Sequence, residues 1–312
     1  MKKFDFYISY LCGSDCVFCC VLDKIKWFRD FGIPPHIPFE EIAGTLKSKR
    51  EENYSYVTFT GGEPTLHPDF PKIVRLAREL GYRISVNSNM SRFADPGYCR
   101  ETLPYINEIV ASVHGHTPEL HNTITGTEKA MEKFMSAMDN IHRLDSDIYL
   151  ITDTVLFTMN LPHISEMCDF LAGIPKLRHV LFSNMNIPPD ATEGLRDYVA
   201  TLPDIEKELP VIVEKIAVRG NRILRFYGLP FCTLKDYSGY SSDLYFEPKR
   251  VLERVKQETG MKEREYSAPK PTMAKKKTEK CSECIYFKTC GGFFNSYYEI
   301  YGDEHIKPIL RG

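Results

Sequence analysis

The sequence lacks features that mark several classes of protein. No stretch comes near the roughly 20 apolar residues of a membrane-spanning helix, and residues 1–10 hold no apolar secretory core. An excess of charge of one sign is also missing, because 40 Lys and Arg face 42 Asp and Glu. The composition therefore draws the chain neither to nucleic acid nor to an anionic membrane. We expect a cytoplasmic protein with no membrane partner, and a nucleic-acid partner is disfavoured.

Cysteine, in contrast, is abundant. A chain of 312 residues with 43% hydrophobic residues can bury a core large enough to be stable without disulfide bonds. Ten cysteines in a long chain without an export signal favour metal ligation. Cys20, Cys99 and Cys168 stand apart from the rest. The other seven form two groups, which we expect to be two metal sites: Cys12, Cys16 and Cys19, and then Cys232, Cys281, Cys284 and Cys290.

Strands and helices alternate along the first part of the chain. Alternating apolar and polar residues, or β-branched runs, predict six strands: residues 3–10, 54–60, 83–87, 108–114, 147–157 and 178–183. Helical spacing predicts helices between them, most clearly over residues 131–141. This order predicts the α/β class, with a parallel sheet and right-handed crossovers. Six units suit a partial (β/α)6 TIM-like barrel, with its motifs at the C-terminal ends of the strands.

The alternation stops after residue 190, and we expect two domains, 1–190 and 191–312. The second is predicted to be a small α+β iron-sulfur domain. Within it, residues 216–226 predict a hairpin that turns at Gly220 and Asn221. Residues 249–258 predict a charged helix, and the lysine-rich residues 270–280 predict a solvated linker.

Cys12, Cys16 and Cys19 have CxxxCxxC spacing on a loop that follows the first predicted strand. Three thiolates from so short a loop can converge on three irons of one 4Fe-4S cube, which leaves the fourth iron open to a ligand. Structural zinc instead takes four closed ligands, usually as two spaced pairs. The loop therefore favours an iron-sulfur cluster over zinc.

A second motif, GGEP, places Gly61, Gly62, Glu63 and Pro64 at the end of the second predicted strand. We expect it to face the cysteine loop across the barrel mouth. Two glycines let the backbone approach a ligand closely, and a carboxylate can pair with an ammonium group. A plain Gly-Gly turn would explain the glycines but not their pairing with CxxxCxxC.

Together the two motifs resemble those of the radical S-adenosylmethionine (SAM) superfamily, over roughly residues 4–190. The resemblance implies that Cys12, Cys16 and Cys19 hold a 4Fe-4S cluster whose open iron is chelated by the amino and carboxylate groups of SAM. It implies that the GGEP loop helps to hold the amino group. Further implied SAM contacts are Phe18 near the adenine, Ser88 and Asn89 near the ribose, and Ser112 in the next strand motif.

The resemblance also implies the chemistry. The cluster, reduced by an electron donor such as flavodoxin or ferredoxin, passes one electron to SAM, and the resulting 5'-deoxyadenosyl radical removes a hydrogen atom from the substrate. Asp153, on an otherwise apolar strand, is a candidate catalytic residue, although a hydrogen bond to backbone would explain it equally well. His114 stands where many members have aspartate, and it is a second candidate beside the simpler role of a hydrogen-bonded loop histidine.

The C-terminal cysteines combine a CxxCxxxxxC run over residues 281–290 with the distant Cys232. Four thiolates can close a site completely, and a zinc knuckle would use such a set. The run also resembles the auxiliary-cluster domain of the superfamily, called Twitch or, in its longer form, SPASM. Phe294 replaces a further cysteine of the longer form, so one auxiliary 4Fe-4S cluster is favoured over two and over zinc.

The substrate is the least determined part of the interpretation. Auxiliary clusters of this kind are commonest in peptide maturation, so the resemblance implies a ribosomally made peptide as the first candidate. A radical dehydrogenase or rearrangement enzyme acting on a small molecule, such as a sugar or cofactor precursor, is the alternative. A non-catalytic metal-binding or interaction protein is a third possibility, which the two complete motifs disfavour.

Overall fold

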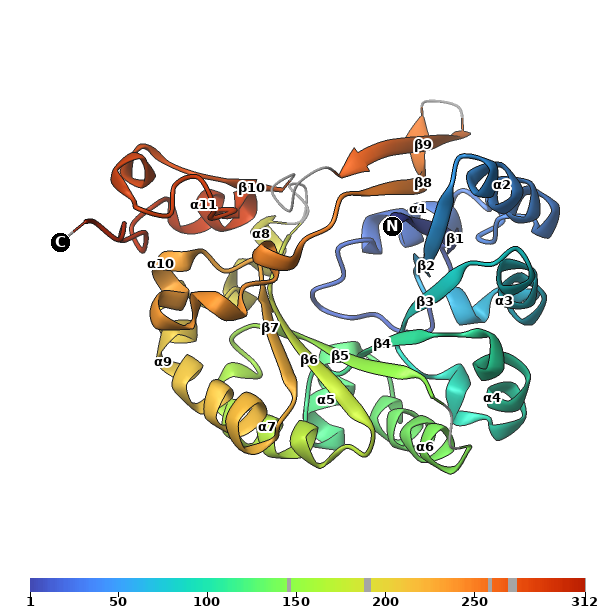
Figure 1. Ribbon diagram of the computed structural model, residues 1–312, viewed down its shortest axis with the longest axis horizontal. Coiled ribbons are helices and arrows are strands. Elements are labelled where there is room, and N and C mark those ends of the chain that lie inside the picture. The colour runs from blue at the N-terminus through green and yellow to red at the C-terminus, as the bar shows by residue number, and fades with distance from the viewer. Residues whose placement is uncertain (145–146, 188–191, 258–259, 269–273, 312) are drawn as a thin grey trace.

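A single curved sheet organises the chain. The computed structural model describes residues 1–144, 147–187, 192–257, 260–268 and 274–311. The nine strands of the sheet lie in the order β7-β6-β5-β4-β3-β2-β1-β8-β9, and helices cover its outer face, so that sheet and helices form an incomplete barrel (Figure 1). The strands are β1 Lys2–Ser9, β2 Tyr54–Gly61, β3 Arg83–Ser88, β4 Glu108–Ser112, β5 Tyr149–Leu156, β6 Leu177–Asn184, β7 Ile223–Tyr227, β8 Lys249–Gln257 and β9 Gly260–Ala268.

Strands β1 to β7 run parallel to their neighbours, and helices connect them. The predicted α/β class and partial TIM-like barrel are confirmed, with β7 as a seventh parallel strand. Among the helices of the described ranges, none is long and apolar enough to cross a membrane. The helices are α1 Leu22–Asp30, α2 Phe39–Glu51, α3 Phe70–Glu79, α4 Pro96–Thr102, α5 Pro118–Thr125, α6 Ala130–Arg143, α7 Ile164–Gly173, α8 Thr192–Leu195, α9 Leu202–Ile212, α10 Phe231–Leu234 and α11 Asn295–Tyr301.

Side chains on β1 alternate between the two faces of the sheet, as the pleat of a strand requires. Phe4, Phe6 and Ile8 are buried in the main hydrophobic core. Tyr7 and the other residues between them are only partly buried. On the neighbouring strand Phe59, in register with Phe6, is buried as well. The inner face of the sheet is consequently the polar one, and it is the face available to ligands.

The predicted hairpin over residues 216–226 is wrong. A π-helix, Val213–Arg219, extends α9, and the amide of Gly220 closes it by donating to Lys215 O at 3.0 Å. The chain then enters β7, which pairs in parallel with β6. Gly220 and Asn221 therefore end a helix before a strand, a use that the turn signal of these two residues does not distinguish from a hairpin.

The predicted charged helix over residues 249–258 is also wrong, because this segment is β8 for as far as it is described. It pairs in parallel with β1 and antiparallel with β9. Its charges are paired across the sheet, since Glu253 is buried and bonded to Lys24 and Arg264. In sequence, charges that are paired across a sheet cannot be told apart from charges on a solvated helix. Here the hydrogen bonds to the neighbouring strands override the local helical propensity.

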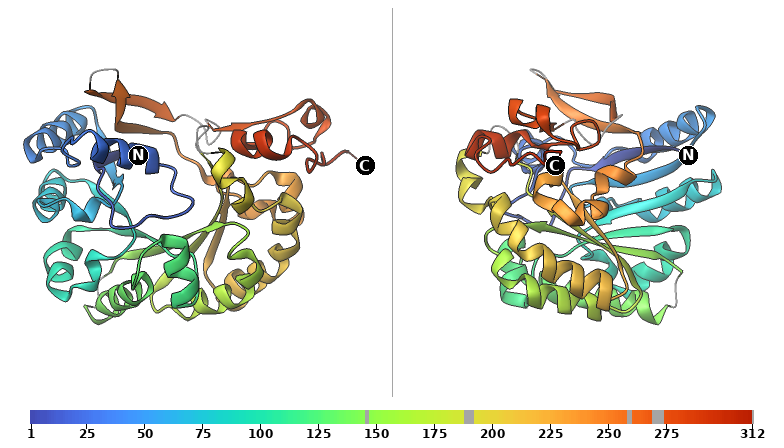
Figure 2. Two further views of the ribbon diagram at one scale, coloured as in Figure 1. Left: turned by 180° about the vertical axis from the view of Figure 1, so that it is seen from behind. Right: turned by 60° about the vertical axis from the view of Figure 1, so that its left-hand side comes forward.

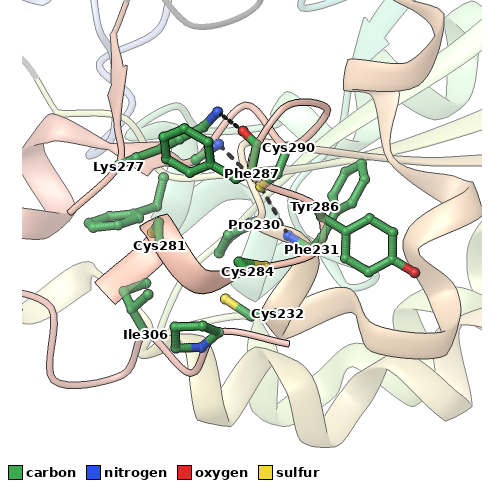
Figure 3. A pocket seen from close by; sticks show the side chains of 13 residues that line it. Pro230, Phe231, Cys232, Lys277, Cys281, Cys284, Tyr286, Phe287, Cys290 and Ile306 are labelled. Carbon is green, nitrogen blue, oxygen red and sulfur yellow. Dashed lines mark hydrogen bonds between the residues drawn. The ribbon is translucent and has the colours of Figure 1, made fainter. Parts of the chain in front are cut away.

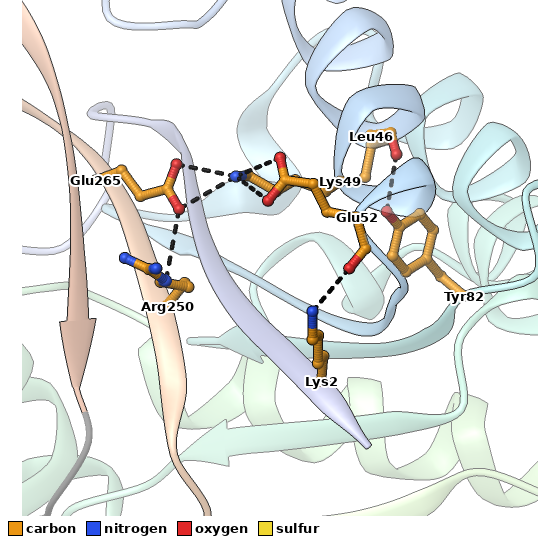
Figure 4. A network of polar contacts seen from close by, with 7 residues as sticks. All are labelled: Lys2, Leu46, Lys49, Glu52, Tyr82, Arg250 and Glu265. Atoms are coloured by element: carbon orange, nitrogen blue, oxygen red, sulfur yellow. Dashed lines mark hydrogen bonds and ion pairs between the residues drawn. The ribbon is translucent and has the colours of Figure 1, made fainter.

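Strand β9 is fastened to α2 by an ion-pair network (Figure 4). Lys49 lies 2.9 Å from carboxylate oxygens of both Glu52 and Glu265, and Arg250 contacts Glu265 at 3.7 Å. Lys2 donates to the carbonyl of Glu52 at 3.0 Å. The network joins the edge of the sheet to the helical layer.

The lysine-rich segment is described only in part. Residues 270–273 lie outside the described residues, as does the predicted domain boundary at residue 190. Beyond them, Lys275 is buried and paired with Asp243 at 2.7 Å. Strand β10, Lys275–Lys276, pairs with β11, Phe293–Phe294. The described part of the segment is therefore structured, contrary to the prediction.

Candidate active site

The cysteine loop between β1 and α1 lies inside the curve of the sheet (Figures 1 and 2). Its backbone is fastened to the end of α5, because the amide of Asp15 donates to Thr125 O at 2.9 Å and that of Val17 donates to Ile124 O at 3.1 Å. Gly126 follows with φ +58°, and a Cβ there would lie 2.7 Å from Asp15 O. The sequence interpretation missed this contact, although a glycine after a helix is a usual C-cap signal.

The two glycines of GGEP let β2 approach the cysteine loop. The amide of Gly62 donates to Ser9 O and that of Glu63 donates to Leu11 O, both at 2.8 Å. A Cβ on Gly61 would overlap Ser9 O, and one on Gly62 would lie 2.5 Å from Leu11 O. Gly61 also has φ +136°, which disfavours other residues. The close approach of the cysteine loop therefore requires both glycines.

Glu63 is a buried hub, with 1% of its surface exposed. One carboxylate oxygen accepts hydrogen bonds from the amide and hydroxyl of Thr65 at 3.1 and 2.6 Å and from the Ser88 hydroxyl at 2.9 Å. The other accepts from the amide of Asn89 at 2.7 Å. Burial raises the pKa of Glu63, and these donors oppose the rise. Pro64 begins the 3-10 turn that follows.

Asn89 extends the hub to the cysteine loop. Its side-chain amide lies 3.2 Å from the Ser14 hydroxyl and 3.9 Å from Cys12 Sγ. The Ser88 hydroxyl donates to Glu63 and accepts from the amide of Met90 at 3.0 Å. Asn89 thus contacts the cysteine loop directly, whereas Ser88 is engaged within the protein.

A cavity of about 700 Å³ opens between these elements. Of the predicted residues around the first site, all but Pro64 line it: Cys12, Cys16, Phe18, Cys19, Gly61, Gly62, Glu63, Ser88, Asn89, Ser112, His114 and Asp153. Cys20 lines it as well, and the lining residues that the sequence interpretation missed include Thr60, Asn87, Arg92, Lys133, Ser183, Asn184, Asn186 and Tyr227. Several stand singly at strand ends, where no short motif marks them.

The three thiols of the loop are free and crowded together. Burial, followed by the neighbouring Cys19 and Cys12, raises the pKa of Cys16. Burial and then Cys20 raise that of Cys19 to about 12. Thiolates this close to one another need positive charge beside them, and iron supplies it when it displaces the protons. The donor set and its surroundings therefore fit a 4Fe-4S cluster with three cysteine ligands.

Asp153 and His114 both line the cavity, and burial shifts their pKa values in opposite directions. The carboxylate of Asp153 accepts a hydrogen bond from the Ser183 hydroxyl at 2.7 Å, and burial raises its pKa to about 6. Burial, followed by the nearby His121, lowers the pKa of His114 well below its usual value. The His114 ring lies edge-on to Phe18, with centroids 4.4 Å apart. Asp153 is thus the better placed of the two to accept a proton near neutral pH.

The four C-terminal cysteines gather around a second, small cavity (Figure 3). The amides of Phe231 and Gly292 donate to Cys290 Sγ at 3.5 and 3.3 Å. Burial, followed by Cys290, raises the pKa of Cys232 to about 11. Within the described ranges, no three His, Cys, Asp or Glu side chains are arranged to hold a single metal ion. The structure brings together the predicted residues Cys232, Cys281, Cys284 and Cys290.

The sequence model of the Radical SAM superfamily matches residues 6–171, more than half of the chain. An "S-adenosylmethionine-dependent nucleotide dehydratase" of Lacinutrix mariniflava is 26% identical over 146 residues, 45% of this chain and 30% of that protein. A "Probable GTP 3',8-cyclase" of Saccharolobus islandicus is 29% identical over 136 residues, 42% of each chain. The chain thus spans less than half the length of these curated relatives.

Two solved structures share the fold. SuiB of Streptococcus suis bound to SAM superposes with a TM-score of 0.64 over 95% of this chain and 73% of that one, at 15% identity. The AdoMet-bound enzyme anSMEcpe superposes with a TM-score of 0.65 over 99% of this chain and 93% of that one, at 14% identity. With a family match over more than half of its length and the same partial barrel, the chain belongs to the radical SAM superfamily of enzymes.

Proposed function

We propose that the large cavity binds a 4Fe-4S cluster on Cys12, Cys16 and Cys19 together with SAM. When bound, this pair supplies a 5'-deoxyadenosyl radical, which removes a hydrogen atom from an organic substrate. One observation carries the proposal: the three thiols, the GGEP loop and Asp153 line one cavity. The chain's own residues then bind, orient and accept protons around the reacting atoms.

We propose roles for the other residues of the cavity from their contacts. Gly61 and Gly62 provide close backbone approach at the SAM end, and Glu63 fixes Asn89 beside Cys12 through its hydrogen bonds. Phe18, held edge-on by His114, offers a ring face to the adenine. Ser88 and Ser112 complete the wall of the cavity.

Asp153 is proposed as the proton acceptor. Removal of a hydrogen atom followed by loss of one electron leaves a substrate that must release a proton to form a double bond. A carboxylate with a pKa of about 6 is mostly ionised at pH 7 and can take this proton. The C-terminal thiols are proposed to hold a second 4Fe-4S cluster, fully ligated by protein, whose contribution is to accept the electron.

A ribosomally made peptide is the first candidate substrate. A groove of about 500 Å³ lies beside the cavity, and Tyr227 lines both. Charges in the groove are paired within the protein, Lys3 with Glu247 and Lys249 with Asp5, so it suits an uncharged chain segment. Its tyrosines are Tyr7, Tyr56, Tyr227, Tyr245 and Tyr266. One structural neighbour, SuiB, is described as bound to its precursor peptide SuiA, with a TM-score of 0.54.

A small phosphorylated molecule is the second candidate, on a different observation. Arg92 and Lys133 line the large cavity, and cationic side chains there can pair with phosphate groups. The two curated relatives reported above are named as a nucleotide dehydratase and a probable GTP cyclase, and both names give a nucleotide as the substrate. Radical dehydrogenation or rearrangement would then take place on the sugar of such a molecule.

The test is formation of 5'-deoxyadenosine by the anaerobically reconstituted protein with dithionite and SAM. We expect the wild type to form it and Cys12→Ala/Cys16→Ala/Cys19→Ala to form none. Cys168→Ala, which removes a buried thiol on α7, is the control and should retain it. Peptides encoded beside the gene and nucleoside triphosphates are then compared, since the true substrate increases the yield. No cleavage by the wild type would favour a non-catalytic metal-binding protein.

A further inference from the structure

A buried ion pair lies outside the two cysteine sites. Lys275 Nζ is 2.7 Å from Asp243, and the two side chains are 0% and 2% exposed. Desolvating two charges is expensive, so a buried ion pair is weak evidence of stabilisation and its position calls for another explanation. One oxygen of Asp243 has no hydrogen-bond partner within the described part of the chain. The pair thus occupies a buried position where an apolar contact would avoid the cost of desolvating two charges.

One side of the pair abuts the C-terminal cysteine site. A Cβ on Gly291 would overlap a carboxylate oxygen of Asp243 and would lie 3.4 Å from Lys275 Nζ. Gly291 directly follows Cys290, whose thiol lines the small cavity. Both charges therefore lie against the backbone of Gly291, next to a proposed ligand of the C-terminal cluster.

The other side of the pair faces the large cavity through Tyr227. Lys275 Nζ lies 4.8 Å from the centroid of the Tyr227 ring. Phe294, the neighbour of Lys275 across β10 and β11, lies 5.7 Å from the same ring. Tyr227 lines the cavity of the first site. The ion pair consequently contacts both the backbone beside Cys290 and Tyr227, which lines the large cavity.

We propose that the Lys275–Asp243 pair sets the reduction potential of the C-terminal iron-sulfur cluster. This inference rests on the second cluster of the proposed function. The potential of such a cluster depends on the net charge and exposure of its surroundings, and buried charges are little screened by solvent. The lysine favours the reduced cluster, and the carboxylate opposes it.

Opposite shifts are expected when one charge is removed at a time. Lys275→Met leaves the carboxylate uncompensated and should lower the reduction potential. Asp243→Asn leaves the ammonium group and should raise it. We expect a roughly tenfold change in the ratio of reduced to oxidised cluster at a fixed potential, about 59 mV for one electron. The double variant Lys275→Met/Asp243→Asn should return close to the original potential, because both charges are gone.

The experiment is a redox titration followed by electron paramagnetic resonance, on full-length protein in the Cys12→Ala/Cys16→Ala/Cys19→Ala background. This background leaves the C-terminal cluster as the only signal, so no substrate is needed. Single variants that break a buried pair lose stability, and the double variant keeps the test possible if one of them fails to fold. Lys280→Met is the control, since the Lys280–Asp303 pair is also C-terminal but partly exposed, and it should shift the potential far less.

The outcomes separate the inference from the proposed function. Shifts of opposite sign that cancel in the double variant would support the ion pair as the tuning element. A normal cluster signal whose potential is the same in every variant would overturn the inference and leave the second cluster standing. Absence of iron and of any signal from the C-terminal cysteines would overturn the second cluster, and the inference with it.

Discussion

Asp153 brings a carboxyl group to the cavity wall formed by β5. Its pKa of about 6 is above its usual value of 3.8, because burial disfavours the charged form. A group whose pKa rises on folding contributes stability that is fully present below its unfolded pKa and is lost as the pH increases through the folded one. At pH 8 the protein therefore carries a buried charge that destabilises it, as catalytic groups often do.

Replacing Asp153 with asparagine separates this stability effect from activity. We expect Asp153→Asn to increase the free energy of unfolding by about 1–3 kcal/mol at pH 8, and by roughly half as much at pH 5, which lies between the unfolded pKa of 3.8 and the folded pKa of about 6. Product formation should fall at least about tenfold, because the amide cannot accept a proton. Urea unfolding at both pH values checks the first point, and an equal difference at pH 5 and pH 8 would contradict it.

Gly62 tests whether the cysteine loop depends on close backbone approach. A Cβ there lies 2.5 Å from Leu11 O, so Gly62→Ala must displace the loop or the strand. We expect a loss of about 1–3 kcal/mol in stability and less iron bound per chain. Gly13→Ala is the matched control on the same loop, because nothing lies within 4 Å of its added Cβ. Equal iron binding by the two variants would show that the approach is unimportant.

Single residues differ in how far the sequence could predict them. The cysteines and GGEP are short motifs with a chemical reason for their spacing, and Cys12, Cys16, Cys19, Gly61, Gly62 and Glu63 line one cavity. Ser88 lines the cavity too, but its hydroxyl is engaged by Glu63 and Met90, so its predicted place near the ribose stays a prediction. Tyr227 belongs to no motif, because its place depends on strands and loops that only the fold brings together.

At the scale of elements, the cysteine loop is held between β1, β2 and the end of α5. The last of these contacts uses Gly126, which ends α5 with φ +58° and leaves room for Asp15. Gly302 ends α11 with the same φ of +58° but has nothing within 4 Å of an added Cβ. The two positions share this φ but differ in ψ, which is 29° at Gly126 and −139° at Gly302, and they differ in the neighbour.

This pair of glycines gives a prediction about how the loop is held. Alanine costs about 1 kcal/mol in the left-handed conformation of Gly126, and it is also strained at Gly302, whose φ and ψ favour glycine. Both variants should therefore lose stability, but Gly126→Ala alone should weaken iron binding at the first site, because it pushes the cysteine loop from α5. Iron analysis of both variants, with urea unfolding to confirm that each is folded, checks this. Equal iron binding by the two variants would mean that only backbone strain matters at Gly126.

The strands of the barrel were more predictable than those that follow it. The six expected strands correspond to β1–β6 with shifts of one or two residues at most of their ends, since each has an apolar run bounded by turn residues. The sequence of β8 predicts a helix because charged residues are frequent in it. They are paired on the sheet, as the contact between Lys249 and Asp5 shows. Only the neighbouring strands reveal those partners.

At the scale of the whole molecule, two groups of thiols lie in two separate cavities of one folded chain. The sequence was sufficient to group the cysteines, because the spacing within each group is characteristic. It was insufficient to place the groups relative to each other, which depends on β7, on β10 and on the buried Lys275. The lysine run was interpreted as solvated because burial of a lysine next to a distant aspartate leaves no local signal.

For the whole chain, we propose that each cysteine group holds its own iron-sulfur cluster. The most direct measurement is iron and sulfide content with low-temperature electron paramagnetic resonance, on wild type, Cys12→Ala/Cys16→Ala/Cys19→Ala and Cys232→Ala/Cys281→Ala/Cys284→Ala/Cys290→Ala. We predict about eight irons per chain for the wild type and about four for each variant, with distinct signals. Zinc at the C-terminal site, or about four irons that all disappear in the first variant, would contradict the claim.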